Sequence, residues 1–224
     1  MTRIFKPGGA GLRSVAGMTS STEPTTSSTD RTADLLAAVL ADLAPVVGGI
    51  TTDLLHRPTP CTQYDVGQLR DHVLGWLTTF AGGFADPEGR APADVGAYRA
   101  PDDPADAAAE VRAAAERLDA ALRAGAADRP LWLGENSMPG DLALSMILWE
   151  YQVHGWDLAR ATGQPWSPPA AAAEASLAFA PGMLTPDYQG PGKAFGPRVP
   201  VPDDAPALDR LLGLSGRDPG WTSD

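Results

Sequence analysis

The amino-acid sequence predicts an all-α protein, a four-helix bundle with a short C-terminal extension. Apolar residues recur at helical spacing in four long segments, which places them on one face of each helix. Two loops rich in Pro, Gly and Asp separate these segments, and the apolar–polar alternation typical of strands is sparse. With 224 residues, 43% of them hydrophobic, the chain is long enough to bury one sizeable core.

Three long helices are expected first, at residues 32–47, 66–84 and 104–124. The first follows a Thr/Asp start signal and stops before two glycines. The second begins after Asp65, whose side chain can cap it, and the third begins at Pro104, which the first turn of a helix tolerates. The connections between them are expected to be a short helical turn and a surface loop, at residues 52–56 and 85–103.

The fourth long helix is expected at 139–162, where Pro139 opens it and Gly163 stops it. The loop before it, 126–140, carries a short irregular edge at 128–133. After it we expect an Ala-rich helix, an extended segment and a last short helix, at residues 168–180, 195–201 and 205–214.

The N-terminal residues 1–30 are expected to be a disordered leader, and residues 31–224 the helical bundle with its tail. Ser, Thr, Glu and Pro dominate the leader, which contains no apolar run of signal-peptide length; Met18 is an alternative start. A single cysteine, Cys61, excludes an intramolecular disulfide and fits a reducing compartment, so we expect a cytoplasmic protein.

The formal net charge of -11 argues against nucleic acid or an anionic membrane surface as the main partner, because both favour a basic face. No segment reaches the roughly 20 apolar residues that a membrane span needs. We therefore expect a small-molecule partner. Bundles of this kind often pair through exposed helix faces, which leaves a homodimer open.

Glu150 and His154 are the most informative pair in the chain. Residues four apart lie on the same face of a helix, so a carboxylate and an imidazole at these positions can close on one cation. His72 is the better candidate for a third ligand, because it falls at the edge of the apolar face of its own helix. Two imidazoles and a carboxylate suit zinc, iron or nickel, and leave a coordination position open for catalysis.

The alternative interpretation is structural: Glu150 and His154 form a helix-surface pair and His72 is a hydrogen-bonded core histidine. Asp157 is expected either to accept a hydrogen bond from a ligand imidazole or to be a helix-end residue. The remaining candidates favour ordinary roles. His56 is expected to be an exposed turn residue, and Cys61 a small packing residue, with a soft metal ligand or a redox thiol as its alternative. Three tryptophans are expected in the core, with a pocket wall as the alternative, and two arginines at the surface, with binding of a substrate carboxylate as the alternative (Trp76, Trp149, Trp156, Arg210 and Arg217).

Two segments, 59–72 (TPCTQYDVGQLRDH) and 150–163 (EYQVHGWDLARATG), resemble the DinB-like superfamily. The tail segments 194–199 and 211–221 are similar to the same branch of that superfamily, the metal-binding branch related to mycothiol-dependent maleylpyruvate isomerase. The resemblance extends over roughly residues 32–221. The tail does not match the separate C-terminal domain of the isomerase itself, so isomerisation of maleylpyruvate is not the expected activity.

The resemblance implies a DinB-like bundle with a divalent metal, commonly zinc, held by His72, Glu150 and His154. It also implies that the thiol of mycothiol, or of a similar low-molecular-weight thiol, occupies the open position and attacks an electrophilic small molecule. A metal-dependent thiol transferase or isomerase is therefore the favoured interpretation. A non-haem iron oxygenase with the same two-His, one-carboxylate set and a non-catalytic metal-binding module are the alternatives.

Overall fold

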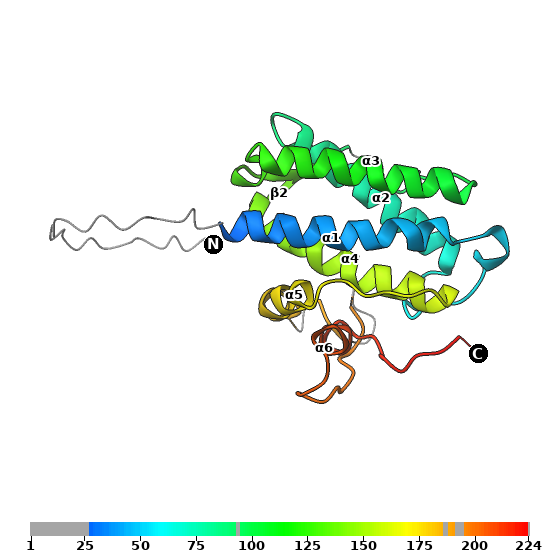
Figure 1. The fold of residues 1–224 in the computed structure, drawn as a ribbon. Helices are drawn as coiled ribbons and strands as arrows, with labels where there is room; N and C mark the ends of the chain where they lie inside the picture. The colour runs from blue at the N-terminus through cyan, green and yellow to red at the C-terminus, as the bar shows by residue number, and fades with distance from the viewer. Residues whose placement is uncertain (1–26, 93–94, 186–187, 191–194, 224) are drawn as a thin grey trace, which may run out of the picture.

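Four long helices form the body of the computed structural model, which describes residues 27–92, 95–185, 188–190 and 195–223. They are α1 (Ser28–Gly48), α2 (Val66–Ala85), α3 (Pro104–Arg123) and α4 (Gly140–Thr162). α1 and α2 each pack against both α3 and α4, and Figure 1 shows α1, α3 and α4 running alongside one another. The all-α bundle expected from the sequence is confirmed.

Shorter elements connect and extend the bundle. They are the 3₁₀ turns η1 (Thr52–Leu54) and η2 (Ala126–Asp128), the strands β1 (Leu131–Leu133) and β2 (Asn136–Met138), and the helices α5 (Ala170–Met183) and α6 (Ala207–Leu214). α5 contacts α4, and α6 contacts α5. Both lie below α4 in Figure 1, on the side away from α3, and form a C-terminal extension of the bundle.

The start of α2 is fixed by a reciprocal cap. The Asp65 side chain accepts a hydrogen bond from the Gln68 backbone N–H at 2.8 Å, and the Gln68 side chain accepts one from the Asp65 N–H at 3.0 Å. Such a capping box satisfies two of the donors that the first turn of a helix leaves free. It sets the rotation of α2, and with it the position of His72 two turns further on.

The start of α4 depends on a close approach of two backbones. A Cβ atom at Gly140 would lie 2.4 Å from the carbonyl oxygen of Arg129 and 2.6 Å from that of Ala127, so only glycine fits there. The end of α4 is fixed by Gly163, whose φ of 72° lies in the left-handed region that favours glycine. Both ends of the helix that carries Glu150 and His154 are therefore defined by glycines.

Replacing Gly140 with alanine is expected to lower the free energy of unfolding by about 1–3 kcal/mol, because the added methyl group meets backbone atoms that cannot rotate away. Gly182→Ala in α5 is the matched control, since its Cβ would enter open space; we expect no loss, and a gain of up to about 1 kcal/mol. Urea denaturation measures both variants. Equal stabilities for the two would contradict the close approach at Gly140.

Two apolar clusters meet along α4. The larger cluster contains residues from all four long helices, with fully buried side chains such as Leu43, Leu77 and Leu144. The smaller joins Trp149 and Val153 of α4 to residues of α5, α6 and the segment between them. One side of α4 therefore faces the bundle and the other faces the C-terminal extension, and the polar residues between these two sides are held at the junction.

Several boundaries differ from the expectation. α1 begins at Ser28 because Ser27 and Asp30 form a capping box, so residues 27–30 belong to the helix and its cap; residues 1–26 of the expected leader lie outside the described part. Residues 131–138, expected as an irregular edge and loop, form an antiparallel hairpin. Among the described residues of 195–201 there is no strand; Phe195 makes a single bridge to Gln189.

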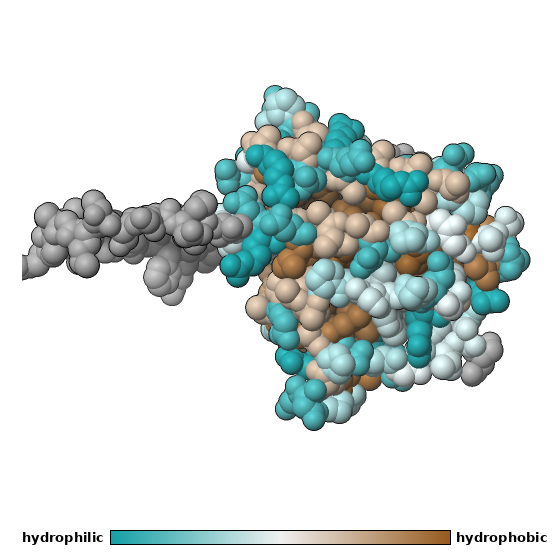
Figure 2. All heavy atoms as spheres, viewed as in Figure 1, coloured by the Kyte–Doolittle hydropathy of each residue, from teal (hydrophilic) through white to brown (hydrophobic). Residues whose placement is uncertain are grey.

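The face viewed in Figure 2 has both polar and apolar side chains at its surface, and the polar ones surround small apolar areas. Within the described residues, no helix combines the length and apolar character needed to cross a membrane.

Candidate functional site

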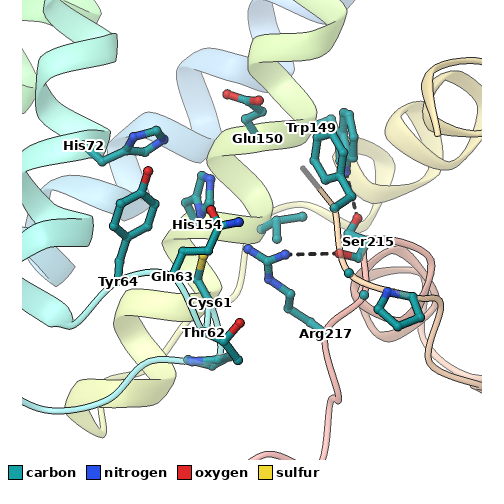
Figure 3. A pocket seen from close by; sticks show the side chains of 16 residues that line it. Cys61, Thr62, Gln63, Tyr64, His72, Trp149, Glu150, His154, Ser215 and Arg217 are labelled. Atoms are coloured by element: carbon teal, nitrogen blue, oxygen red, sulfur yellow. Dashed lines mark hydrogen bonds between the residues drawn. The ribbon is translucent and has the colours of Figure 1, made fainter. Parts of the chain in front are cut away.

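A cavity of about 350 Å³ lies where α2, α4, the loop before α2 and the C-terminal segment meet. His72 lines it from α2, Glu150 and His154 from α4, Cys61 from the loop and Arg217 from the C-terminal segment. Figure 3 shows the loop residues and the C-terminal residues on opposite sides of the space beside His154. The cavity is therefore enclosed by segments that are distant in the sequence.

The three predicted metal ligands line this one cavity. The ring centroids of His72 and His154 are 5.3 Å apart, and Glu150 lies one turn before His154 on α4. In the described part of the chain, neither the Glu150 carboxylate nor an imidazole nitrogen of His72 has a hydrogen-bond or ion-pair partner. Their ligand atoms do not all lie within 4.8 Å of one another, so the three side chains must come closer together before they can share a cation.

His154 is held from one side. Its Nδ1 lies 3.2 Å from Oδ2 of Asp157, which fits the first of the two roles expected for Asp157, that of hydrogen-bond acceptor for an imidazole. When Nδ1 carries the proton, it donates to the carboxylate, and Nε2 is left as a neutral lone-pair donor. Ligand histidines usually have such a partner on the other ring nitrogen, because it fixes both the tautomer and the ring orientation.

Asp157 is in turn paired with Arg217. The Arg217 Nε donates to both carboxylate oxygens at 3.3 Å, and Nη2 donates to Oδ2 at 3.0 Å. The Asp157 side chain is fully buried and the Arg217 side chain is 9% exposed. The expectation that Arg217 is a surface residue is therefore wrong; a guanidinium is tolerated in the interior here because a buried carboxylate neutralises it.

Cys61 provides a second way to build a metal site. A ligand atom of Cys61, one of His154 and one of Asp157 all lie within 4.8 Å of one another, and this set shares His154 with the predicted one. Burial raises the pKa of the Cys61 thiol, an effect that the nearby Arg217 only partly offsets. The thiol therefore stays protonated near neutral pH, which disfavours it as a resident thiolate nucleophile.

The electrostatics of the predicted ligands suit cation binding. Burial, with a smaller contribution from His154, lowers the pKa of His72 to about 4, so its imidazole is neutral at physiological pH. Burial also raises the pKa of the Glu150 carboxyl, only partly offset by His154 and Arg217. A carboxylate with no partner and a neutral imidazole fit a divalent cation, which would supply the missing positive charge.

The low pKa of His72 predicts acid sensitivity of the metal-free protein. Between pH 6.5 and about 4 the unfolded chain binds a proton at His72 that the folded chain does not bind, so the free energy of unfolding falls as the pH falls through this window. Because His72 is partly exposed and solvent screens the effect, we expect a loss of about 1–2 kcal/mol. His72→Gln should lack it, and urea denaturation at several pH values measures both; parallel losses in the two proteins would contradict this assignment.

Other candidates have structural positions. His56 is exposed, with 95% of its side chain accessible, as expected for a turn residue. Trp149 is buried, stacks on Phe195 with ring centroids 4.9 Å apart and donates from Nε1 to the Ser215 hydroxyl at 2.9 Å. It forms a wall of the cavity as well as part of the core.

Sequence reasoning missed the contribution of the C-terminal segment to the cavity. Phe195, Gly196 and Pro197 line it together with Ser215, Gly216 and Arg217. The only sequence signal for their role was that residues 194–199 and 211–221 belong to the family resemblance, which indicated a shared feature but not its position.

Comparison with known proteins finds one matching family and two similar proteins. Residues 36–159 match the family described as mycothiol maleylpyruvate isomerase N-terminal domain. Two Mycobacterium tuberculosis proteins named as uncharacterized, MT0763 of strain CDC 1551 / Oshkosh and Rv0738 of strain H37Rv, are each 32% identical over 190 residues, which cover 84% of this chain and 94% of the relative. No solved structure matches the chain.

Proposed function

Because the chain belongs to the family of the mycothiol maleylpyruvate isomerase N-terminal domain and has its helical, DinB-like fold, we propose that it is a metal-dependent enzyme that activates a low-molecular-weight thiol. In this proposal His72, Glu150 and His154 hold a divalent cation, with zinc first and nickel or iron as alternatives. The thiol is mycothiol or a close analogue, and it attacks an electrophilic small molecule by S-transfer or in an isomerisation. The cytoplasm, where such thiols stay reduced, is the proposed location.

The observation that carries the proposal is the position of His154. Its imidazole is fixed at Nδ1 by Asp157, while the cavity beside it contains His72 and a carboxylate without a partner. A bound cation would act as a Lewis acid that lowers the pKa of the incoming thiol, so that a nucleophile exists near neutral pH. The protein itself orients His154 through the contact with Asp157.

His72 borders two pockets. On one side lies the enclosed cavity, with the polar side chains of Gln63 and Ser215 available to a polar thiol. On the other side, His72 also lines a more open pocket of about 560 Å³ together with Trp76 and Arg99. His72 therefore borders both spaces, and the more open pocket offers a small molecule a second route toward the proposed metal ligands.

The test combines metal analysis with a thiol assay. Purified protein is examined by elemental analysis, beside His72→Ala and His154→Ala, and the metal-loaded protein is then incubated with mycothiol and a bimane or halonitrobenzene electrophile. We expect stoichiometric metal and thiol-dependent consumption of the electrophile above the uncatalysed rate, both lost in the variants.

Each part of the proposal has its own contrary result. Absence of stoichiometric metal would remove the site. Metal binding without any rate above background would favour the non-catalytic module, and oxygen consumption by the iron-loaded protein with an oxidisable substrate would favour the oxygenase. A homodimer is a further proposal, which the molecular mass in solution tests.

A further inference from the structure

Two sets of ligand atoms overlap at His154. One is the proposed set with His72 and Glu150, on the side of the cavity next to α2. The other is the set with Cys61 and Asp157, whose ligand atoms are mutually within 4.8 Å. A thiolate, an imidazole and a carboxylate are all ordinary zinc ligands, so the second set is chemically competent as well. The short distances between its ligand atoms favour the second set as the metal site. Another feature of the structure must therefore keep the metal away from Cys61 and Asp157.

That feature is the engagement of Asp157. Its Oδ2 interacts with Nδ1 of His154 at 3.2 Å and accepts from Nη2 of Arg217 at 3.0 Å, while Nε of Arg217 donates to both oxygens at 3.3 Å. To coordinate a cation, Asp157 would have to give up donors that it now holds. The released guanidinium would then remain in the interior without its counter-charge, which is strongly unfavourable.

Arg217 is itself fixed by the C-terminal segment. Its Nη1 donates to the Ser215 carbonyl oxygen at 3.1 Å, and its backbone N–H donates to the Leu212 carbonyl at 2.9 Å. The turn before it needs Gly216, whose φ is 79° and whose Cβ, if present, would lie 2.8 Å from the Gly196 carbonyl oxygen. The guanidinium therefore cannot follow Asp157 if that side chain moves toward a cation.

We propose that Arg217 is a positioning residue that reserves Asp157 for His154 and thereby directs the metal to His72, Glu150 and His154 instead of Cys61, His154 and Asp157. This inference rests on the proposed function, because it concerns the same metal. Arg217 lies beyond the matched family region, which ends at residue 159. The C-terminal segment thus determines which ligands the bundle uses, and it leaves the coordination sphere free of protein sulfur until a thiol enters.

Cobalt(II) is the probe, because a thiolate ligand adds a sulfur-to-cobalt charge-transfer band in the near ultraviolet and a set of imidazole and carboxylate ligands does not. Without added thiol, the wild-type protein is expected to bind cobalt(II) and show no such band. Arg217→Gln frees Asp157 and should show the band, and the double variant Arg217→Gln/Cys61→Ser should lose it again. Arg160→Gln is the matched control, since Arg160 holds the same segment through the Trp221 carbonyl, 2.7 Å from its Nε, and should keep the wild-type spectrum.

Three results would overturn the inference without removing the bound metal, and the first of them would also replace the ligand set of the proposed function. They are a Cys61-dependent band in the wild-type protein, an Arg217→Gln spectrum equal to that of the wild type, and weaker cobalt binding in Arg217→Gln with no sulfur band. If Arg217→Gln does not fold, Arg217→Lys carries the test, because a single ammonium cannot hold both oxygens as the guanidinium does; a weaker band is expected, and an unchanged spectrum contradicts the inference. A wild-type protein that binds no cobalt(II) removes the metal site and this inference together.

Discussion

His154→Ala is expected to abolish stoichiometric metal binding and with it thiol-dependent turnover. His154 belongs to both possible ligand sets, so no alternative set of three remains when it is removed. Loss of an outer hydrogen-bonding partner typically weakens metal affinity by about 10–100-fold, and loss of a direct ligand should exceed the upper end of that range. Isothermal titration with zinc and elemental analysis of the purified variant measure the effect.

His56→Ala is the matched control for this variant. It removes a histidine from the same chain, but one that is 95% exposed and outside the cavity, so zinc binding should remain at the wild-type level. A His154→Ala protein that is folded and still carries one metal per chain would show that the metal is bound elsewhere.

Glu150→Gln is expected to have opposite effects on the metal-free and the metal-bound protein. Burial raises the pKa of the Glu150 carboxyl, which means that the folded state disfavours its charge; a neutral amide removes this penalty at neutral pH and should raise the melting temperature without metal. The same change removes the anionic ligand. Zinc at 100 times its dissociation constant stabilises a folded protein by about 2.7 kcal/mol, and for a chain of this size each kcal/mol is worth about 2–4 °C.

Thermal unfolding with and without zinc therefore gives a signature in two directions. Wild type should gain stability on zinc addition, and Glu150→Gln should begin higher and gain little. Glu116→Gln, on the exposed face of α3, controls for the loss of a negative charge and should behave like wild type. If zinc stabilises Glu150→Gln as much as wild type, Glu150 is not a ligand.

The helices that hold the site were predictable because local signals define them. Asp65 and Gln68 form the cap that begins α2, and Gly163 ends α4 at the expected residue. Helical periodicity then indicated that His72 and the Glu150–His154 pair face inward, and the structure places all three on one cavity. Whether they bind a metal stays a prediction.

Features that depend on contacts between distant segments were not predictable. The hairpin of β1 and β2 has strands of only three residues. Its central residue, Trp132, donates a backbone hydrogen bond to Gly89 and accepts one from Ala91, which are both about 40 residues earlier in the chain. Arg217 is buried because of a carboxylate 60 positions earlier, a pairing that no local pattern indicates. Neither feature leaves a periodic trace in the sequence.

The wall formed by residues 195–197 and 215–217 is attached to α4 through Trp149, which contacts Phe195 and Ser215, and through Asp157, which pairs with Arg217. Exchanging this stretch between relatives would therefore alter the size and polarity of the cavity, while the cap that begins α2 and the glycine that ends α4 stay unchanged. The range of substrates can then change among relatives while the helical bundle is retained.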